Sequence, residues 1–362
     1  MNILFLNSAR RGRGGNEQSV LIATSTLSKE HGVVLAYRKE DIGEHFTITK
    51  YRLPFLNEAD IYTIARLVQI VRKHSIDVII PSKRKDYFLA GIVSRLCKTK
   101  NIMWLGAVRD LENNPVYNIV YNKLADGIIV NARKIRETLL KSSYMRDDKI
   151  KVIYYGIDTE NIQSKCPEAP KEISACMTIS SMGRLDTNKG PRFLIESFAL
   201  FLSYEKNINA KLVIIGDGPE KANLQQLAKQ LNIEKKINFT GFLENPYPQL
   251  HQSDVFALTS ISEGLSIALL EAMYLENAPV STFAGGGVTE IIEEGTSGYL
   301  ISYGEKEKLA DILHLLYRDP LLRKITAAKA RQRVMEQYST SLMKQEITAF
   351  LQSLTASTRK KQ

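Results

Sequence analysis

Hydrophobic and polar positions alternate along the chain in the pattern of parallel βαβ units. Short apolar runs, each as long as a buried strand, are separated by segments in which apolar residues recur at helical spacing. In the first half of the chain these runs lie at 3–7, 77–81, 102–105, 127–130 and 151–154. The alternation predicts an α/β fold in which helices cover a parallel sheet.

A second series of apolar runs follows a break in the pattern. The break, Pro167-Glu-Ala-Pro-Lys-Glu, has no periodicity and indicates a linker. The later runs lie at 175–181, 210–216, 236–239, 254–259, 279–282 and 298–301. Because the two series share no visible sequence repeat, we predict two similar domains rather than a solenoid. Their predicted bounds are 1–160 and 175–337, with the linker at 161–174.

Length and composition indicate an ordinary globular protein. The chain has 362 residues, of which 44% are apolar, enough to fill the cores of two domains. Its three cysteines, Cys97, Cys166 and Cys176, have neither paired nor metal-type spacing, so we expect reduced thiols in a cytoplasmic protein. No stretch reaches the roughly 18 apolar residues of a membrane-spanning helix, and we expect a soluble chain.

Positive charge is concentrated in the first domain. Residues 1–160 hold 26 Lys and Arg against 17 Asp and Glu, a net charge of +9 out of +10 for the whole chain. Such a domain can attract nucleic acid, an anionic membrane face or an acidic acceptor. No zinc-finger spacing, RRM-type aromatic signature or helix-turn-helix is evident. The asymmetry favours peripheral contact with the inner membrane face, with plain surface charge as the alternative.

Two glutamates eight positions apart, Glu263 and Glu271, lie around the start of a predicted amphipathic helix. A strand, a short polar loop and a helix N-terminus together make an anion site. Glu271 would lie about 12 Å beyond Glu263 at roughly 1.5 Å per residue, a span comparable to that between the two sugars of a nucleotide-sugar. One carboxylate could accept hydrogen bonds from a transferred sugar and the other from a ribose. The diphosphate would then lie over Gly264, Leu265, Ser266 and Ile267; the alternative is two solvated glutamates.

Two groups of cations also follow predicted strands. Arg184 and Lys189 lie in a glycine-flanked loop that opens a helix, where they can converge on a diphosphate leaving group as its negative charge grows. Lys83, Arg84 and Lys85 follow the strand at 77–81, at the edge of the sheet where ligands of such folds bind. They suggest a phosphate or carboxylate on an acceptor. Solvated surface cations are the alternative for both groups.

Four segments, taken together, resemble a known family. They are Met182-Gly-Arg-Leu-Asp-Thr-Asn-Lys-Gly, Ile215-Gly-Asp-Gly-Pro-Glu, the Glu263 to Glu271 segment, and Phe283-Ala-Gly-Gly-Gly-Val-Thr-Glu. In this order and spacing they are similar to the retaining glycosyltransferases of family GT4, strongly from 180 to 320 and continuously back to Met1. The resemblance implies the GT-B fold, two Rossmann-like doubly wound domains facing across a cleft. It also implies an acceptor-side first domain, a nucleotide-sugar-binding second domain, and a C-terminal helix at 338–356 that crosses back to the first. A terminal helix on the second domain is the alternative.

The resemblance also implies roles for individual residues. Relatives carry the Arg184 and Lys189 pair on the diphosphate, and Glu263 and Glu271 would hold the donor sugar and the ribose. Further donor-side positions are Gly14 and Gly15 in the N-terminal glycine loop, Gly216, which we read as mainly structural, and Phe242, near the base or in the core. Relatives commonly place a His in the first domain near the reacting carbon. Arg109 stands there in this chain, which leaves the acceptor side open.

The expected reaction is retaining transfer of a sugar from a nucleotide-sugar, UDP-, GDP- or ADP-linked, to a hydroxyl of a glycan or glycolipid, as in cell-surface polysaccharide or lipopolysaccharide synthesis. We expect neither a metal nor a cofactor, because the chain lacks the Asp-x-Asp motif of metal-dependent relatives of another fold. The alternative is a catalytically silent nucleotide-sugar-binding subunit that regulates or scaffolds a partner. A nucleic-acid binder is a third possibility, and we expect no nucleic-acid partner.

Overall fold

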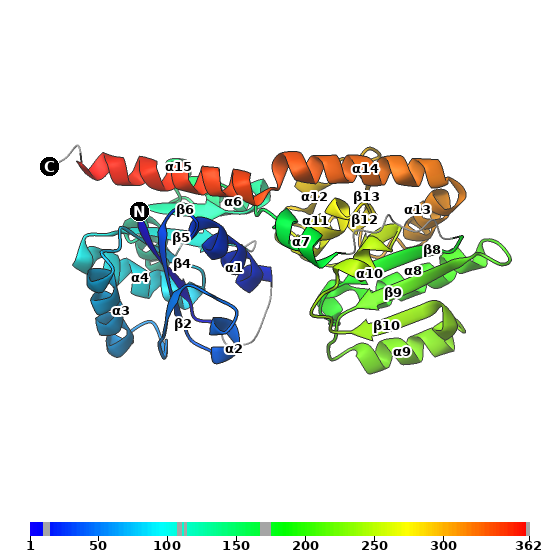
Figure 1. The fold of residues 1–362 in the computed structure, drawn as a ribbon, viewed down its shortest axis with the longest axis horizontal. Coiled ribbons are helices and arrows are strands. Elements are labelled where there is room, and N and C mark those ends of the chain that lie inside the picture. The colour runs from blue at the N-terminus through cyan, green and yellow to red at the C-terminus, as the bar shows by residue number, and fades with distance from the viewer. Residues whose placement is uncertain (10–14, 107–110, 112–113, 167–174, 360–362) are drawn as a thin grey trace. The chain divides into compact units, whose positions relative to one another are not determined.

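The computed structural model describes residues 1–9, 15–106, 111, 114–166 and 175–359. The chain divides into two compact units, shown in Figure 1. The N-terminal unit comprises Met1–Gly156 and Thr340–Gln362, and the C-terminal unit comprises Ile157–Ser339. Helix α7 (Thr159–Lys165) occupies the beginning of the segment that the sequence assigned to a linker.

The N-terminal unit is built on a seven-stranded parallel sheet with the order β3-β2-β1-β4-β5-β6-β7. Its strands are β1 (Asn2–Asn7), β2 (Gly32–Tyr37), β3 (Thr49–Arg52), β4 (Val78–Pro81), β5 (Lys100–Leu105), β6 (Gly127–Val130) and β7 (Ile150–Val152). Central strands of a parallel sheet are covered on both faces and therefore read as continuous apolar runs. Five of the seven are the strands that such runs predicted.

Strands β2 and β3 were not predicted. Strand β2 is a buried apolar run after Gly32, so its signal was present in the sequence. Strand β3 is different, because it pairs only with β2 at the edge of the sheet and three of its four residues are exposed. An edge strand of this kind carries no apolar run to recognise.

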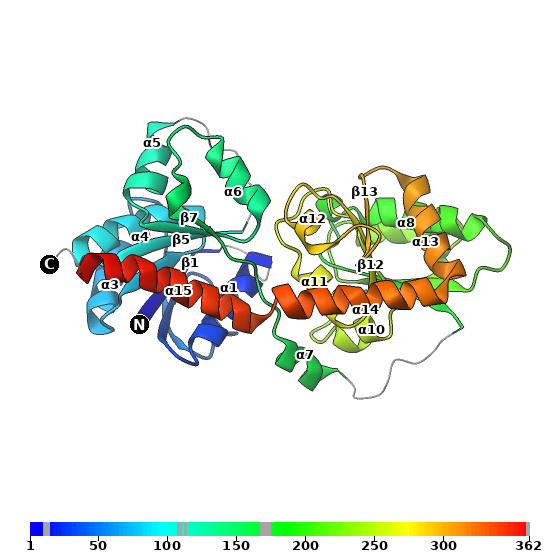
Figure 2. The same cartoon turned by 90° about the horizontal axis from the view of Figure 1, so that it is seen from above.

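Helices cover both faces of this sheet. They are α1 (Gly15–Leu27), α2 (Glu40–Gly43), α3 (Ile61–Lys73), α4 (Arg84–Cys97), α5 (Pro115–Asn118), α6 (Arg133–Leu140), the 3-10 turn η2 (Asp147–Lys149) and α15 (Thr340–Arg359). Helix α3 packs with α4, and α1 packs with α15 (Figures 1 and 2). Helix α15 approaches β6 so closely that a Cβ on Gly127 would lie 2.8 Å from Leu354 Cδ1.

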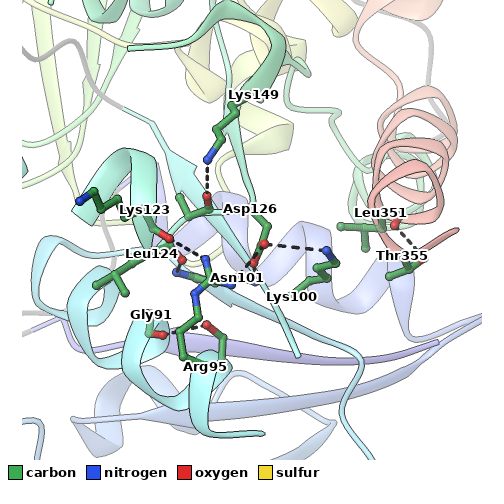
Figure 3. Close-up of polar contacts among 12 residues, drawn as sticks. Gly91, Arg95, Lys100, Asn101, Lys123, Leu124, Asp126, Lys149, Leu351 and Thr355 are labelled. Carbon is green, nitrogen blue, oxygen red and sulfur yellow. Dashed lines mark hydrogen bonds and ion pairs between the residues drawn. The ribbon is translucent and has the colours of Figure 1, made fainter. Parts of the chain in front are cut away.

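A π-helical turn, η1 (Ile119–Lys123), continues α5 and ends in a polar network (Figure 3). Helix ends leave carbonyl groups without partners inside the helix. Here Arg95 donates to the Lys123 carbonyl at 2.6 Å, and Asn101 donates to the Leu124 carbonyl at 3.0 Å. Lys149 donates to the Ala125 carbonyl at 2.9 Å. The C-terminal end of this turn is therefore fixed against α4, β5 and η2.

The C-terminal unit repeats the architecture with a six-stranded parallel sheet of order β10-β9-β8-β11-β12-β13. Its strands are β8 (Met177–Met182), β9 (Ala210–Ile215), β10 (Ile237–Gly241), β11 (Val255–Leu258), β12 (Ala278–Thr282) and β13 (Tyr299–Ile301). Its main helices are α8 (Pro191–Ser203), α9 (Lys221–Gln230), α10 (Tyr247–His251), α11 (Ile267–Tyr274), α12 (Val288–Ile291), α13 (Lys306–Arg318) and α14 (Pro320–Gln337), with 3-10 turns η3 (Thr187–Lys189) and η4 (Glu234–Lys236). Helix α8 packs with α13, and α11 with α14.

Each sheet has a point where the strand order reverses, between β1 and β4 in one unit and between β8 and β11 in the other. Open α/β sheets bind ligands at the carboxyl ends of the strands beside such a point. In the C-terminal unit, the loops in this position are those that follow β8 and β11. Among the described helices, none has the length and apolar character that crossing a bilayer requires.

Candidate functional site

The loops after β8 and β11 are joined by hydrogen bonds. Asn188 Nδ2 donates to the Ser262 carbonyl at 3.1 Å, and the Ile261 N–H donates to the Asn188 carbonyl at 2.7 Å. Thr259 Oγ1 donates to the Lys189 carbonyl at 3.2 Å. The two loops line a hollow at the carboxyl ends of the strands, between the backbone of β8 and the start of α8.

Lys189, which lines this hollow, contacts Glu263. The Lys189 ammonium pairs with Glu263 Oε1, and the Ser260 hydroxyl donates to the same oxygen at 2.9 Å. The Glu263 side chain is only 12% exposed, so its position is set by these partners rather than by solvent. The sequence placed both charged residues in a site without predicting their contact. It also missed Ser260, although a hydroxyl three residues before the glutamate in the same loop was a usable signal.

Arg184 lies beside the pair with most of its side chain open to solvent. Its side chain is 59% exposed, and its Nε lies 3.6 Å from Asp186 Oδ2. The Asp186 carboxylate in turn accepts from the Lys189 N–H at 3.2 Å, so one acidic residue orders both cationic positions. The arrangement places two cations and two carboxylates, those of Asp186 and Glu263, at the reversal point of the sheet, and cations beside hydrogen-bond acceptors suit a phosphorylated polar ligand.

Gly216 and Phe242 lie at the ends of β9 and β10. The Gly216 N–H donates to the Gly241 carbonyl at 2.8 Å, and a Cβ on Gly216 would lie 1.9 Å from the Gly183 carbonyl oxygen. Its φ of +135° is also a conformation that other residues rarely adopt. Gly216 thus lets the backbone at the end of β9 approach the backbone at the end of β8 closely. Phe242 is 67% exposed, so it is not a core residue.

Helix α11 begins at Ile267 with Ser266 as its N-cap. An α-helix leaves its first N–H groups without partners inside the helix, and the Ser266 hydroxyl accepts from one of them, Leu269 N–H, at 3.4 Å. The preceding Glu263 and Gly264 are held by the loop after β12. The Glu263 N–H donates to the Ala284 carbonyl at 2.9 Å, and the Gly287 N–H donates to the Gly264 carbonyl at 2.6 Å.

Glu271 lies inside α11 and is 9% exposed. The hydroxyl of Tyr247, on α10, donates to Glu271 Oε1 at 3.2 Å. Burial raises the pKa of Glu271 to about 7, and the hydrogen bond from Tyr247 offsets part of that increase. The carboxyl therefore changes charge near neutral pH. Sequence reasoning missed Tyr247, which no motif or spacing marks as a partner of Glu271.

The pH dependence of stability should report this carboxyl. A group whose pKa is higher in the folded state than in the unfolded chain, here about 7 against 4.5, contributes stability below the lower value and loses it as pH rises through the higher one. Near pH 5, Glu271→Gln should therefore have the same melting temperature as the wild type. At pH 8 it should melt at a higher temperature, because its free energy of unfolding should exceed that of the wild type by on the order of 1–3 kcal/mol. Melting curves at several pH values measure the difference, and an offset that does not change with pH would contradict it.

The cations predicted on the acceptor side do not converge. Lys83 pairs with Glu17 of α1. Arg84 Nη2 donates to the Tyr117 hydroxyl at 2.7 Å, and Lys85 Nζ donates to a loop carbonyl, that of Leu56, also at 2.7 Å. Among the remaining positions, Gly15 is the first residue of α1, whereas Gly14 and Arg109 lie outside the described residues.

A buried carboxyl, Asp86, lies at the same edge of the N-terminal sheet and was not predicted. Its Oδ2 accepts from the Ser8 N–H at 3.0 Å, and among the described residues its Oδ1 has no hydrogen-bond partner. Burial raises the pKa of Asp86 to about 6. In the part of the chain that the structure describes, no three His, Cys, Asp or Glu side chains gather as metal ligands would.

Residues 171–333, nearly all of the C-terminal unit, match the protein family described as "Glycosyl transferases group 1". A Campylobacter jejuni relative, N-acetylgalactosamine-N,N'-diacetylbacillosaminyl-diphospho-undecaprenol 4-alpha-N-acetylgalactosaminyltransferase, is 31% identical over 245 residues, 67% of this chain. The chain spans 64% of that relative's length and between 37% and 50% of the lengths of three further curated relatives.

Solved structures share the fold over nearly the whole chain. HepE from Anabaena, solved in complex with UDP, has a TM-score of 0.84 at 22% identity and covers 98% of this chain and 100% of its own. The apo lipopolysaccharide outer core galactosyltransferase WaaB has a TM-score of 0.75 at 20% identity, with coverage of 98% and 100%. The predicted GT-B fold, with two doubly wound parallel sheets, is confirmed.

Proposed function

This chain belongs to the group 1 glycosyl transferases, family GT4, and from that premise we propose that it moves a sugar from a nucleotide-sugar to a hydroxyl of a glycan or glycolipid with retention. The observation that carries the proposal is the contact between Lys189 and Glu263 beside Arg184. It supplies a fixed acceptor for sugar hydroxyls beside two cations for a diphosphate, and both cations line the hollow of the C-terminal unit.

Arg184, Lys189, Glu263 and the start of α11 each have a part in the proposed reaction. As the glycosidic bond breaks, its electron pair passes to the diphosphate, and Arg184 and Lys189 stabilise the negative charge that grows there. The leaving diphosphate takes the proton of the acceptor hydroxyl, whose oxygen bonds to the same face of the sugar carbon. Glu263 accepts hydrogen bonds from the transferred sugar, and the N-terminus of α11 at Gly264–Ile267 adds N–H groups and a favourable dipole.

The nucleoside lies farther along the same edge in this proposal. Glu271 accepts hydrogen bonds from the ribose, and Tyr247 fixes the orientation of its carboxyl. The exposed ring of Phe242, next to Gly241 at the end of β10, offers a face for the base. The UDP in the HepE structure supports a uridine donor. Gly216 keeps the neighbouring backbones close enough to form this edge.

We place the acceptor on the N-terminal unit. The C. jejuni relative is named for an undecaprenol-diphosphate-linked sugar, and WaaB for lipopolysaccharide outer core, so both support an acceptor carried by a lipid. Lys83, Arg84, Lys85 and Arg109 are the residues we propose on the acceptor side, and we propose Gly14 and Gly15 as further donor-binding residues. An acceptor of this kind places the protein on the cytoplasmic side of a membrane.

Thermal-shift measurements with UDP-, GDP- and ADP-sugars test the proposal first. Because a ligand that binds only the native state stabilises it by RT ln(1 + [L]/Kd), the true donor should raise the melting temperature and the others should not. Slow hydrolysis of that donor by the wild type should then be lost in Glu263→Gln and kept in Glu307→Gln, an exposed glutamate on α13. Donor binding without hydrolysis or transfer would support the catalytically silent subunit instead.

A further inference from the structure

The N-terminal unit carries exposed apolar side chains on both sides of two adjacent cations. We call this set the docking strip: Leu56, Ile61, Tyr62, Arg84, Lys85, Val116 and Ile119. Its apolar members are between 44% and 79% exposed. Large apolar side chains gathered with cations mark a surface that meets another phase or partner. We propose that the docking strip binds the surface of a bilayer that carries anionic headgroups.

Hydrogen bonds join the strip into one surface. Lys85 Nζ donates to the Leu56 carbonyl, and the Leu56 N–H donates to Asp60 Oδ2 at 2.9 Å. Asp60 is also the N-cap of α3, so this contact ties the loop to Ile61 and its neighbour at the start of that helix. On the other side, the Arg84 guanidinium lies 5.4 Å from the centre of the Tyr117 ring, on α5 between the remaining apolar members.

Hydrogen bonds anchor the two segments that carry the apolar side chains of the strip. The π-helical turn that carries Ile119 is anchored at its far end by Arg95, Asn101 and Lys149 (Figure 3). The start of α3 is held by the Asp60 cap, which accepts from the Thr63 N–H at 2.9 Å. Both segments are thus fixed while their apolar side chains face solvent.

The net charge of the N-terminal unit favours a bilayer with anionic headgroups. The N-terminal unit holds 30 Lys and Arg against 16 Asp and Glu, a net charge of +14, whereas the C-terminal unit holds 19 against 23, a net charge of −4. Cations close to an anionic membrane surface strengthen binding, and the attraction is screened by salt.

This inference deepens the proposed function, on which its biological sense rests, because a lipid-linked acceptor lies in a membrane. Helices α3, α4 and α5 follow β3, β4 and β5 in the chain, so the strip belongs to the carboxyl edge of the N-terminal sheet. Docking through this edge brings the acceptor side of the unit to the lipid. The binding itself needs no nucleotide-sugar and can be measured without one.

Sedimentation of the full chain with vesicles tests the proposal. Vesicles of phosphatidylcholine mixed with phosphatidylglycerol should bind the wild type, and vesicles of phosphatidylcholine alone should bind it much less. Ile61→Ser with Tyr62→Ser should weaken binding about tenfold or more. Arg84→Gln with Lys85→Gln should weaken it by about fivefold for each cation removed, and should flatten its salt dependence. Two independent variants keep the test valid if one of them folds poorly.

The other end of α4 offers a matched control. Leu96 is 61% exposed in the last turn of that helix, and the exposed Lys98 follows as its C-cap. Leu96→Ser with Lys98→Gln removes the same kinds of group about 18 Å from Arg84, at roughly 1.5 Å per residue. This variant should bind vesicles like the wild type.

Three outcomes would overturn the inference. They are wild-type binding by both strip variants, an equal loss in the Leu96 and Lys98 control, and equally tight binding of random single-stranded RNA that depends on the same strip residues. Donor hydrolysis by the Ile61 and Tyr62 variant should match the wild type in solution. Failure of hydrolysis in every protein with intact vesicle binding would reject the proposed function and leave the docking strip standing.

Discussion

Replacement of Lys189 by alanine should lower turnover by about 10²–10³, the effect of removing one electrostatic stabiliser from a transition state. In the proposed reaction the lost ammonium balances the growing charge on the leaving group, and in the structure it contacts Glu263. Affinity for the nucleotide-sugar should change much less than turnover, because the charge grows only as the bond breaks. Steady-state kinetics and a binding isotherm on the same variant separate the two effects.

A matched control comes from the same unit. Arg331 pairs with Glu276 at 2.7 Å on the surface of α14, and its removal changes the net charge equally. Arg331→Ala should keep full turnover. The effects of Lys189→Ala and Glu263→Gln on turnover should also be strongly non-additive, because each change removes one partner of the same ion pair. Turnover within about threefold of the wild type in Lys189→Ala would contradict the role of this residue, because one lost stabiliser costs far more.

Gly286→Ala should damage both stability and activity. A Cβ at this position would lie 1.7 Å from the Glu263 carbonyl oxygen and 2.9 Å from the Gly264 carbonyl oxygen, both backbone atoms, so the loop itself must move. A displacement of about 1 Å at a reacting group can cost about 10²-fold in rate, and we expect a loss of that size or more. The clash should also cost about 2–3 kcal/mol of stability, measured as a lower melting temperature.

Gly285→Ala is the control for this change. It lies one residue away, and a Cβ there would meet nothing within 4 Å. Its φ of +66° makes alanine unfavourable by about 1–2 kcal/mol, so some stability should be lost without displacement of Glu263. Equal turnover in the two variants would show that the contact between the loops does not position the glutamate.

The sequence predicted the fold well because parallel strands are buried on both faces and leave apolar runs. It failed at the exposed edge strand β3, where that condition does not hold, and it also missed β2, although the apolar run of that strand was present. For charged residues next to one another in the chain, the individual contacts could not be predicted from the sequence. Lys83, Arg84 and Lys85 stand at a helix start, where consecutive side chains point in different directions, and each contacts a different element.

Contacts within the site were harder to predict than its members. Lys189 and Glu263 are 74 residues apart, and Tyr247 and Glu271 are 24 apart. The first pair forms because the parallel sheet places the carboxyl ends of β8 and β11 side by side, and the second forms between helices α10 and α11. Periodicity and spacing report a residue's own element, and they carry no signal for a partner on another one. The raised pKa of Glu271 depends on such packing and was equally out of reach.

The position of α15 has a consequence for the order in which the chain folds on the ribosome. This helix, made from the last residues of the chain, buries Met343, Ile347 and Leu351 in the N-terminal unit. The C-terminal unit is one continuous segment, so all of it is synthesised before α15 emerges. Until then the N-terminal unit lacks a covering helix and keeps apolar surface open beside α1. The unit whose synthesis begins first is therefore the one that is completed last.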